Sequence, residues 1–370
     1  MKSELSRRRI MQAFGAMALV PALKPAAVSS SWPPAEGPEI PKICLELSAG
    51  RLSAGTQDEA GMRRVKQLGV DYVLTGGPLI PWEEADIRSR IERLKAAGLT
   101  LYNMMIGGFP NTLYGRAGRD EEIDKVRQSI RAAGQAGLAV IEYNFYAHRL
   151  VEGYYEEIGR GGAGLTAFDY DRVKNLPPLQ DEGVHKLEEM WSNITYFLKA
   201  VVPVAEESGV RLALHPNDPP APLSRGSEQI MGTVAGWKRL IEIVPSPANG
   251  ITFDCGVTRE MGEDPVEVCR YFGGKQRINH VHFRNVRVRT PYEKYTEVFT
   301  DEGQVDMFGV MKELVRQKYS GTIYPEHPRA LDADRQQADF KSFYPGGGGY
   351  TGFAYNVGYT KAMLQAALCS

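Results

Sequence analysis

The chain has few cysteines and no excess of positive or negative charge. Its 370 residues include only four cysteines, which lie far apart in the sequence with no CxxC spacing. This argues against a disulfide framework or a zinc ribbon and favours reduced thiols. The 44 Lys and Arg residues nearly balance the 45 Asp and Glu residues, so no overall charge attracts nucleic acid or an anionic membrane surface. We therefore expect a globular protein whose partner is a small molecule. Self-association into a homo-oligomer is also compatible with the sequence.

The sequence also lacks a membrane span and a dinucleotide-binding fingerprint. The longest apolar stretch near the N-terminus, residues 10–20, is shorter than the ~20 residues that a span needs. No G-x-G-x-x-G follows the first predicted strand, which removes the main support for a doubly wound dinucleotide-binding sheet. A different α/β architecture is therefore expected.

Apolar or β-branched runs alternate with helical patterns from residue 42 onward, in eight pairs. Such alternation is typical of parallel strands joined by helical crossovers, and eight units predict a single-domain (β/α)8 TIM barrel. The predicted strands are 42–47, 70–76, 99–105, 138–145, 210–215, 250–256, 278–285 and 321–327. The clearest predicted helices, with apolar residues at three- and four-residue spacing, are 82–98, 120–137, 187–209 and 306–319.

The N-terminus has the layout of an export signal. Three adjacent arginines, 7–9, precede the apolar stretch and then small residues, which predicts a twin-arginine signal peptide over residues 1–33 and a catalytic domain over 34–370. The protein would then be exported or periplasmic, and cytoplasmic if the signal is not functional. The alternative is a basic amphipathic helix.

Two segments are predicted to cover the barrel mouth. Residues 146–185 are too long and too rich in Gly and Tyr for a simple connection, so we interpret them as an insertion after strand four. Residues 344–352, YPGGGGYTG, form a second candidate mouth loop, because glycines let the backbone bend close to a ligand.

Ligand-type side chains stand at the ends of four consecutive predicted strands. In a TIM barrel the carboxyl ends of the strands converge on one site. Two imidazoles with carboxylates suit a borderline divalent ion such as Mn²⁺, Fe²⁺ or Zn²⁺. Any one such histidine is more often an ordinary hydrogen-bonded residue, but the repetition favours a metal site. The residues are His215, Asp254, Cys255, His282, Glu326 and His327.

Strand alternation separates neighbours in this set. His280 and His282 share a face, with His282 nearer the mouth, so His280 is expected in a lower layer or the core. Asp254 and Cys255 point to opposite faces, so only one of them is a ligand, and Cys255 is the alternative to Asp254. A buried apolar role for Cys255 is also open.

Three prolines follow His215 and are expected to fix its position. Pro216, Pro219 and Pro220 end ladder pairing and fix the direction of the loop, which would hold the histidine in place. Asp218 is expected to orient the imidazole as carboxylates often do for metal-bound histidines.

Several segments together resemble a known family. They are SNITYFLKAVVPVAEESGVRLALHPNDPP (192–220), ANGITFDCG (248–256), VHFRNVR (281–287), DEGQVDM (301–307), YPEH (324–327) and PGGGGY (345–350). In this order they resemble the signature segments of the mannonate dehydratase family, strongly over 187–330. The resemblance implies a TIM barrel that binds Mn²⁺ or Fe²⁺ and converts D-mannonate to 2-keto-3-deoxy-D-gluconate and water in hexuronate (glucuronate) breakdown.

Carried over by position, the resemblance implies metal ligands at His215, His282, Asp254 and Glu326. Asp254 stands where the family has cysteine, and Glu326 where it has aspartate; both changes favour a harder ion such as Mn²⁺ or Mg²⁺. The implied acid–base pair is His327 and Tyr350. The candidate substrate-binding residues are Asn144, Arg284, Asn285 and Tyr355, and for Arg284 a structural salt bridge is an equally open role.

The sequence is compatible with three alternative functions, of which the dehydratase is the first. Tyr355 lies near the position where the family has an arginine, which bears on how a sugar-acid carboxylate is recognised. Besides the dehydratase, the sequence is compatible with an exported metal-dependent sugar isomerase or epimerase of the xylose-isomerase-like kind, because fold alone does not separate these reactions. The third alternative is a carbohydrate-binding barrel without activity, against which the retention of His327 and Tyr350 argues.

Overall fold

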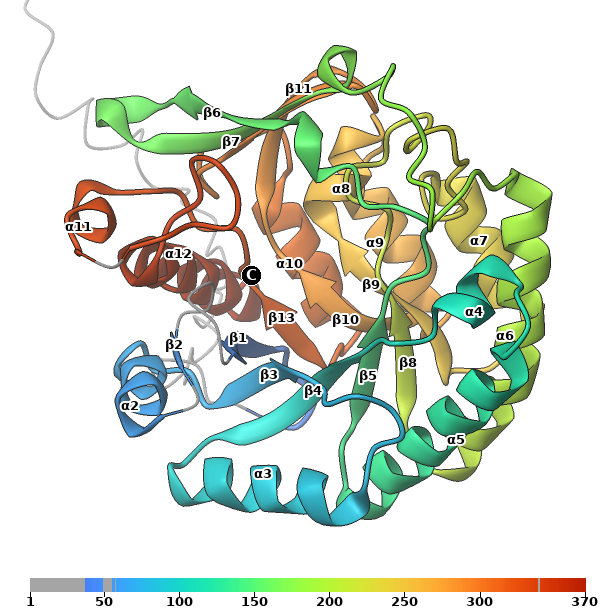
Figure 1. Cartoon of the computed structure of the whole chain (residues 1–370). Helices are drawn as coiled ribbons and strands as arrows, with labels where there is room; N and C mark the ends of the chain where they lie inside the picture. The colour runs from blue at the N-terminus through green and yellow to red at the C-terminus, as the bar shows by residue number, and fades with distance from the viewer. Residues whose placement is uncertain (1–36, 49–54, 57, 339) are drawn as a thin grey trace, which may run out of the picture. The chain divides into compact units, whose positions relative to one another are not determined.

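A closed ring of eight parallel strands forms the centre of the protein (Figure 1). The computed structural model describes residues 37–48, 55–56, 58–338 and 340–370. The last strand pairs with the first, with Lys42 opposite Thr322, which closes the barrel. The strands are β1 (Lys42–Ser48), β3 (Tyr72–Gly76), β4 (Thr100–Ile106), β5 (Val140–Tyr143), β8 (Arg211–Leu214), β9 (Asn249–Asp254), β10 (Ile278–His282) and β13 (Thr322–Tyr324). The predicted TIM barrel is confirmed, whereas the predicted signal segment lies outside the described residues.

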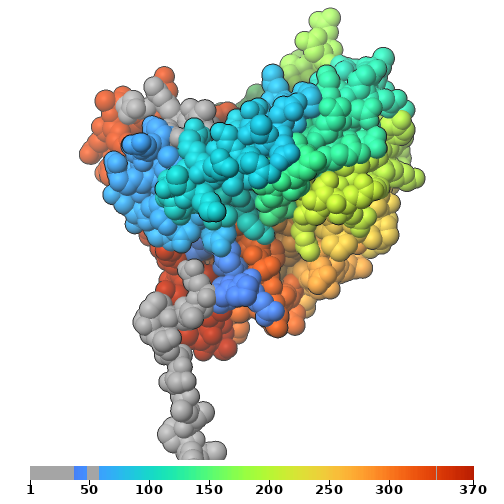
Figure 2. All heavy atoms as spheres, turned by 90° about the horizontal axis from the view of Figure 1, so that it is seen from below, coloured from blue at the N-terminus to red at the C-terminus, as the bar shows by residue number. Residues whose placement is uncertain are grey.

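Helices surround the barrel, and Figure 2 shows α3, α5 and α6 side by side over one face. The longer helices are α2 (Glu59–Gln67), α3 (Glu84–Ala96), α5 (Arg119–Ala136), α6 (Leu187–Glu207), α7 (Val234–Ile243), α9 (Pro265–Gly274), α10 (Met307–Arg316) and α12 (Tyr350–Leu368). Short elements are β2 (Gly55–Thr56), α4 (Pro110–Tyr114), α8 (Cys255–Glu260), α11 (Asp332–Arg335) and the 3-10 turns η1 (Val151–Gly153), η2 (Arg160–Gly162) and η3 (Tyr170–Arg172).

Helix α5 illustrates how local sequence sets these helices. Its first turn is acidic, which suits the positive end of the helix dipole. Ile123, Val126 and Ile130 recur at three- and four-residue spacing and are buried, and each such side chain contributes about 1.5–3 kcal/mol on burial. The helix ends at Gly137, whose φ of 85° is a left-handed conformation that glycine adopts without strain.

A second, antiparallel sheet accompanies the barrel. Its order is β11 (Asn285–Thr290), β12 (Lys294–Val298), β7 (Gly164–Asp169) and β6 (Tyr154–Ile158). Strands β6 and β7 come from the predicted insertion, and they pair with a hairpin that the sequence analysis missed. The alternation in NVRVRT and KYTEV, joined by a short turn, is a hairpin signal that was available. Phe168 and Tyr295 are buried in the small core of this sheet.

Several strands end earlier than predicted, including those predicted over 138–145 and 321–327, which end at Tyr143 and Tyr324. Two further ends bear on the site. The strand predicted over 250–256 ends at Asp254, because the Asp254 carboxylate accepts a hydrogen bond from the Val257 amide and caps α8. The strand predicted over 278–285 ends at His282, and Asn285 already begins the antiparallel β11. All four cysteines are free. Among the described helices, none is both long and apolar enough to cross a membrane.

Candidate active site

A cavity of about 340 Å³ opens at the carboxyl ends of the barrel strands. It is lined by residues of β1, β3, β4, β5, β10 and β13, by the segments that follow β5, β8 and β13, and by the glycine-rich loop before α12. The lining side chains include Glu142, Asn144, Arg149, His215, His282, Glu326, His327, Arg329 and Tyr344. Both segments predicted to cover the mouth therefore reach this cavity, one through Arg149 and the other through Tyr344.

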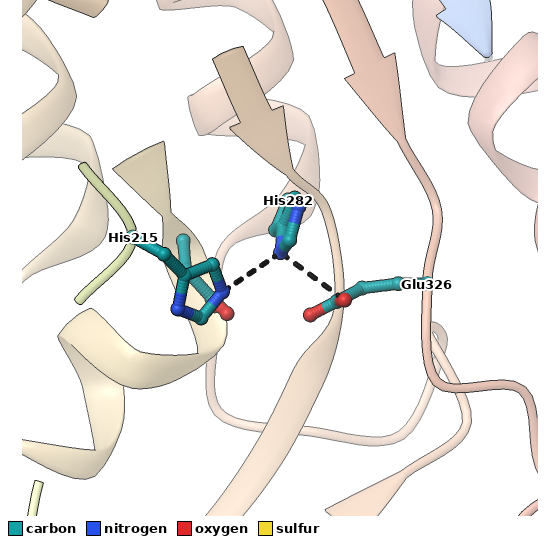
Figure 3. A group of neighbouring side chains, drawn as sticks. His215, His282 and Glu326 are labelled. Carbon is teal, nitrogen blue, oxygen red and sulfur yellow. Dashed lines mark hydrogen bonds and ion pairs between the residues drawn. The ribbon is translucent and has the colours of Figure 1, made fainter. Parts of the chain in front are cut away.

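The structure brings the four predicted metal ligands together. One ligand atom from each of His215, Asp254, His282 and Glu326 lies within 4.8 Å of the others. Figure 3 shows His215, His282 and Glu326 converging on one point: His215 Nε2 lies 3.2 Å from His282 Nδ1, and His282 Nδ1 lies 3.1 Å from Glu326 Oε2. Two imidazoles and two carboxylates thus form a candidate site for a divalent ion.

Each imidazole contacts a neighbouring oxygen through its far ring nitrogen, which orients its near nitrogen toward this point. His215 Nδ1–H donates to the Pro216 carbonyl at 2.7 Å, so His215 Nε2 carries the lone pair. His282 Nε2 lies 3.4 Å from Glu142 Oε1, which favours a proton on Nε2 and the lone pair on Nδ1. His215 Nε2 and His282 Nδ1 lie 3.2 Å apart beside two carboxylates, so a cation is needed between them, either a proton on His282 or a metal ion in its place. The residues present therefore fit a metal ion.

The charges in the cluster support the same interpretation. Burial, with a smaller effect of nearby His282, lowers the pKa of His215 to about 3, so this ring is neutral. Burial alone would lower the pKa of His282, but the carboxylates of Glu326 and Glu142 outweigh it and raise the pKa to about 9. Burial raises the pKa of Asp254 to about 6, although Arg284 opposes the shift. The cluster therefore stabilises a positive charge at its centre.

Arg284 lies behind this cluster and does not line the cavity. Its side chain is buried, with Nε donating to Asp254 Oδ2 at 3.0 Å and Nη1 donating to Glu260 Oε1 at 2.6 Å. Glu326 Oε1 is 3.2 Å from Arg284 Nε. The chain makes room for the guanidinium at Gly256, where a Cβ would lie 2.8 Å from Arg284 Cγ. Of the two roles open for Arg284, the structure therefore shows the structural salt bridge, which holds the carboxylates of Asp254 and Glu326, and not the substrate contact.

Asn285 and Cys255 also take roles other than those predicted. Asn285 is bonded to backbone, with Nδ2 donating to the Thr300 carbonyl at 2.9 Å, so it fixes a loop away from the cavity. Cys255 Sγ lies 3.4 Å from the His282 carbonyl and 3.3 Å from the Arg284 carbonyl, and the ligand cluster contains Asp254 in its place. This happens because α8 begins at Cys255 and turns its side chain into the core.

Asp218 also differs from the expectation. The Pro216 carbonyl, not Asp218, is bonded to the His215 ring. Asp218 instead accepts a hydrogen bond from the Tyr154 hydroxyl at 2.8 Å. Burial alone would raise the pKa of Asp218, but Arg284 and Arg149 lower it to about 2. Asp218 therefore joins the insertion to the barrel as a buried carboxylate.

His327 faces the cavity beside the metal cluster. Its Nε2 lies 3.5 Å from Glu326 Oε2, and its Nδ1 lies 3.0 Å from both carboxylate oxygens of Glu297. Burial alone would lower the pKa of His327, but the Glu297 and Glu326 carboxylates raise it. Glu297 lies on β12, so the antiparallel sheet supplies the carboxylate that orients this imidazole.

The backbone at His327 is held in an uncommon conformation. Its φ is 47°, in the left-handed region that costs a non-glycine residue about 1–3 kcal/mol. Arg329 stabilises this turn, because its Nη2 donates to the His327 carbonyl at 2.7 Å and to Glu297 Oε2 at 2.7 Å. Such strain is held where surrounding contacts fix a functional side chain.

The tyrosine beside His327 is Tyr344, which the sequence analysis did not single out. The two ring centroids are 5.1 Å apart, and Tyr344 lines the cavity. Tyr350 is not among the lining residues; it begins α12, and its hydroxyl donates to the Arg64 carbonyl at 3.0 Å. The glycine-rich loop was recognised, but it brings the tyrosine before Pro345 into the cavity.

Tyr355 also lies away from the cavity lining. Its hydroxyl accepts a hydrogen bond from Arg160 Nη2 at 3.0 Å, and its ring packs against Phe299 at 5.4 Å. Asn144 is the one predicted substrate residue that lines the cavity. Glu142, two residues earlier, was missed although the alternation of a strand places it on the same side. For Arg149, on the insertion, no local signal was available, and the hairpin signal around Glu297 does not indicate which residue that carboxylate meets.

Comparison with known proteins places the chain in a family. The family model described as D-mannonate dehydratase (UxuA) matches residues 179–368, slightly more than half of the chain. Mannonate dehydratase of Streptococcus pneumoniae is 28% identical over 350 residues, which cover 85% of this chain and 93% of that protein. The Enterococcus faecalis mannonate dehydratase is 30% identical over 289 residues, covering 68% of this chain and 79% of that one.

Solved structures also include a match to a mannonate dehydratase. The crystal structure of mannonate dehydratase from Streptococcus suis serotype 2 matches with a TM-score of 0.78 and 26% identity, over 89% of this chain and 95% of that chain. A structure of L-ribulose 3-epimerase matches with a TM-score of 0.54 but only 13% identity, over 89% and 96% of the two chains, and so shares the fold alone. From its sequence and its barrel together, this chain belongs to the D-mannonate dehydratase family, a family of hydro-lyases.

Proposed function

We propose that this chain dehydrates D-mannonate to 2-keto-3-deoxy-D-gluconate, with a divalent metal held by His215, Asp254, His282 and Glu326. The observation that carries the proposal is the convergence of these four ligand atoms within 4.8 Å beside His327, in a chain that belongs to the mannonate dehydratase family. A cavity of about 340 Å³ is large enough for a six-carbon sugar acid.

The reaction requires two proton transfers and the loss of one hydroxyl group. The proton on C2 leaves, the C3–O bond breaks, the departing hydroxyl takes up a proton to become water, and the resulting enol becomes the 2-keto acid. A bound divalent ion would supply Lewis acidity, which stabilises the negative charge that develops when the C2 proton leaves. His327 and Tyr344 are the two cavity-lining groups placed to accept and donate these protons.

The surroundings of these two groups suit that task. Glu297 binds His327 Nδ1 and thereby turns His327 Nε2 toward Glu326 and the cavity. Burial raises the pKa of Tyr344, which keeps its phenol protonated at neutral pH and able to donate. The barrel wall and the insertion enclose the reacting atoms, which limits competition from bulk water.

We propose Mn²⁺ or Fe²⁺ as the ion. Two imidazoles and two carboxylates combine borderline nitrogen ligands with hard oxygen ligands, and these two ions accept such a mixture. Metal analysis of the purified chain, followed by removal with a chelator and reloading with single ions, identifies which one supports the reaction.

The test is direct. Purified chain loaded with Mn²⁺ is incubated with D-mannonate, and the 2-keto-3-deoxy acid is measured by its carbonyl chemistry and by mass. Product is expected with the loaded chain and not with the chelated chain or with His282→Ala. Absence of product, combined with solvent deuterium entering a neutral sugar, would instead identify a sugar isomerase or epimerase. Sugar binding without either reaction would identify a binding protein.

We also propose that residues 1–33 direct export by the twin-arginine route. The support is the run of three arginines at 7–9 followed by the apolar stretch at 10–20. Fusion of residues 1–33 to a reporter that is scored outside the cytoplasm tests this, with the three arginines changed to lysine as the control. Export that is equal in both fusions would contradict the twin-arginine proposal.

A further inference from the structure

Arg149 occupies a distinctive position in the cavity wall. It lies in the insertion just before η1 and lines the cavity, with a side chain that is 30% exposed. Its Nε donates to the Asp218 carbonyl at 3.0 Å, and its Nη2 lies 3.4 Å from Asp218 Oδ2. One edge of the guanidinium is therefore fixed to the proline-rich loop that follows His215.

The other arginines near the cavity, Arg284 and Arg329, are buried and so less accessible to a ligand. Arg329 is 1% exposed, and its donors are directed to the His327 carbonyl and to Glu297. Arg284 is buried among carboxylates behind the metal cluster. Within the described part of the chain, Arg149 Nη1 donates no hydrogen bond, so Arg149 combines exposure to the cavity with an uncommitted donor.

The charge around the cavity makes such a donor important. Buried carboxylates from Glu142, Asp254, Glu297 and Glu326 surround the floor of the cavity. These groups repel an anionic substrate, and an arginine directed at its carboxylate offsets the repulsion beyond what a bound metal ion would do, with parallel donors in a fixed plane. The Tyr344 ring, 5.4 Å from the Arg149 guanidinium carbon, packs on this plane and helps to fix it.

We propose that Arg149 forms the carboxylate-binding subsite of this cavity, taking the carboxylate of a sugar acid on the guanidinium edge that Asp218 leaves free. The inference rests on the proposed function, in that it assumes an acid substrate. The cation would then come from the insertion that follows β5.

The test compares an acid with its uncharged counterpart. Binding of D-gluconate and of D-mannitol to the Mn²⁺-loaded chain is measured by titration calorimetry for the wild type, Arg149→Gln and Arg149→Lys. Loss of a charge-assisted hydrogen bond weakens binding by about 10- to 100-fold. Arg149→Gln is expected to lose this factor for D-gluconate while its affinity for D-mannitol stays within about twofold. Arg149→Lys is expected to recover part of the loss, because it keeps the charge without the fork.

Arg225→Gln is the matched control. Arg225 lies in the loop after β8, binds Glu152 at 3.0 Å through Nε, and does not line the cavity, so its loss is expected to leave the gluconate-to-mannitol ratio unchanged. Unchanged mannitol affinity in Arg149→Gln also shows that the variant is folded.

The outcomes separate the two proposals. A wild-type preference for gluconate that persists in Arg149→Gln overturns the subsite alone. A wild type without any preference for the acid overturns both the subsite and the dehydration of a sugar acid. If Arg149→Gln loses the preference but the wild type forms no 2-keto-3-deoxy acid, the subsite stands and the proposed reaction does not.

Discussion

Replacing Asp254 with asparagine is expected to weaken Mn²⁺ binding by more than about 100-fold, because it removes one of the two carboxylates of the candidate metal cluster. Loss of a group that merely supports a metal ligand costs about 10- to 100-fold in affinity, so loss of a ligand is expected to exceed this. A factor of 100 corresponds to about 2.7 kcal/mol of binding free energy.

The substitution is designed to leave the fold intact. Asp254 Oδ1 accepts from the Val257 amide at 2.8 Å and caps α8, and asparagine caps a helix as well as aspartate does. Arg284 loses its contact with Asp254 Oδ2 but keeps the bond from Nη1 to Glu260 at 2.6 Å. Thermal denaturation without metal should therefore change little compared with the loss of metal affinity.

Cys255→Ala is the matched control. The Cys255 thiol is buried and lies next to the carbonyls of His282 and Arg284, so it contributes packing and no ligand atom to the cluster. We expect a loss of about 1–2 kcal/mol in the free energy of unfolding with metal stoichiometry preserved. Calorimetric titration with Mn²⁺ and elemental analysis of dialysed protein measure both variants. The reasoning is refuted if Asp254→Asn retains wild-type affinity while Cys255→Ala loses the metal.

Three further substitutions test other parts of the site. Glu297→Gln is expected to lower kcat by about 10- to 100-fold, because the amide carries no charge to hold the adjacent histidine; unchanged Mn²⁺ affinity distinguishes this from metal loss, and an unaltered kcat would contradict it. Tyr344→Phe should lower kcat by about 10²-fold or more, whereas Tyr350→Phe should change it by no more than about twofold; steady-state assays showing the reverse order would favour Tyr350. Gly256→Ala places a Cβ 2.8 Å from a buried arginine and should destabilise the fold by about 1–3 kcal/mol in urea, whereas Gly274→Ala, with open space around it, should stay within about 1 kcal/mol; equal midpoints would show that the arginine moves freely.

The sequence by itself determined the barrel and brought the residues of the candidate metal site to one end of it. Strand and helix periodicities are local, because they depend on which side of a single element faces the core. Eight such units leave few arrangements other than a closed barrel. Once the strands are parallel, residues at their carboxyl ends must meet, which is why His215, His282 and Glu326 were identified before any coordinates.

Local sequence patterns also identified the two segments that reach the cavity mouth. The length and composition of 146–185 identified the insertion, and the glycine run identified the loop at 344–352. Neither pattern specifies which side chain of the segment enters the cavity. Tyr344 and Tyr350 lie in the same loop region, and only the path of the folded chain places the first beside His327.

Tertiary structure alone decided the contacts between distant segments. Glu297 reaches His327 because an extra hairpin pairs with the insertion, and Arg149 reaches Asp218 across 69 residues of sequence. Arg284 turned from a predicted substrate ligand into a buried counter-ion, because β10 ends two residues before it. Such contacts depend on how whole elements pack against one another. The local sequence around a residue does not determine which distant residue it will contact.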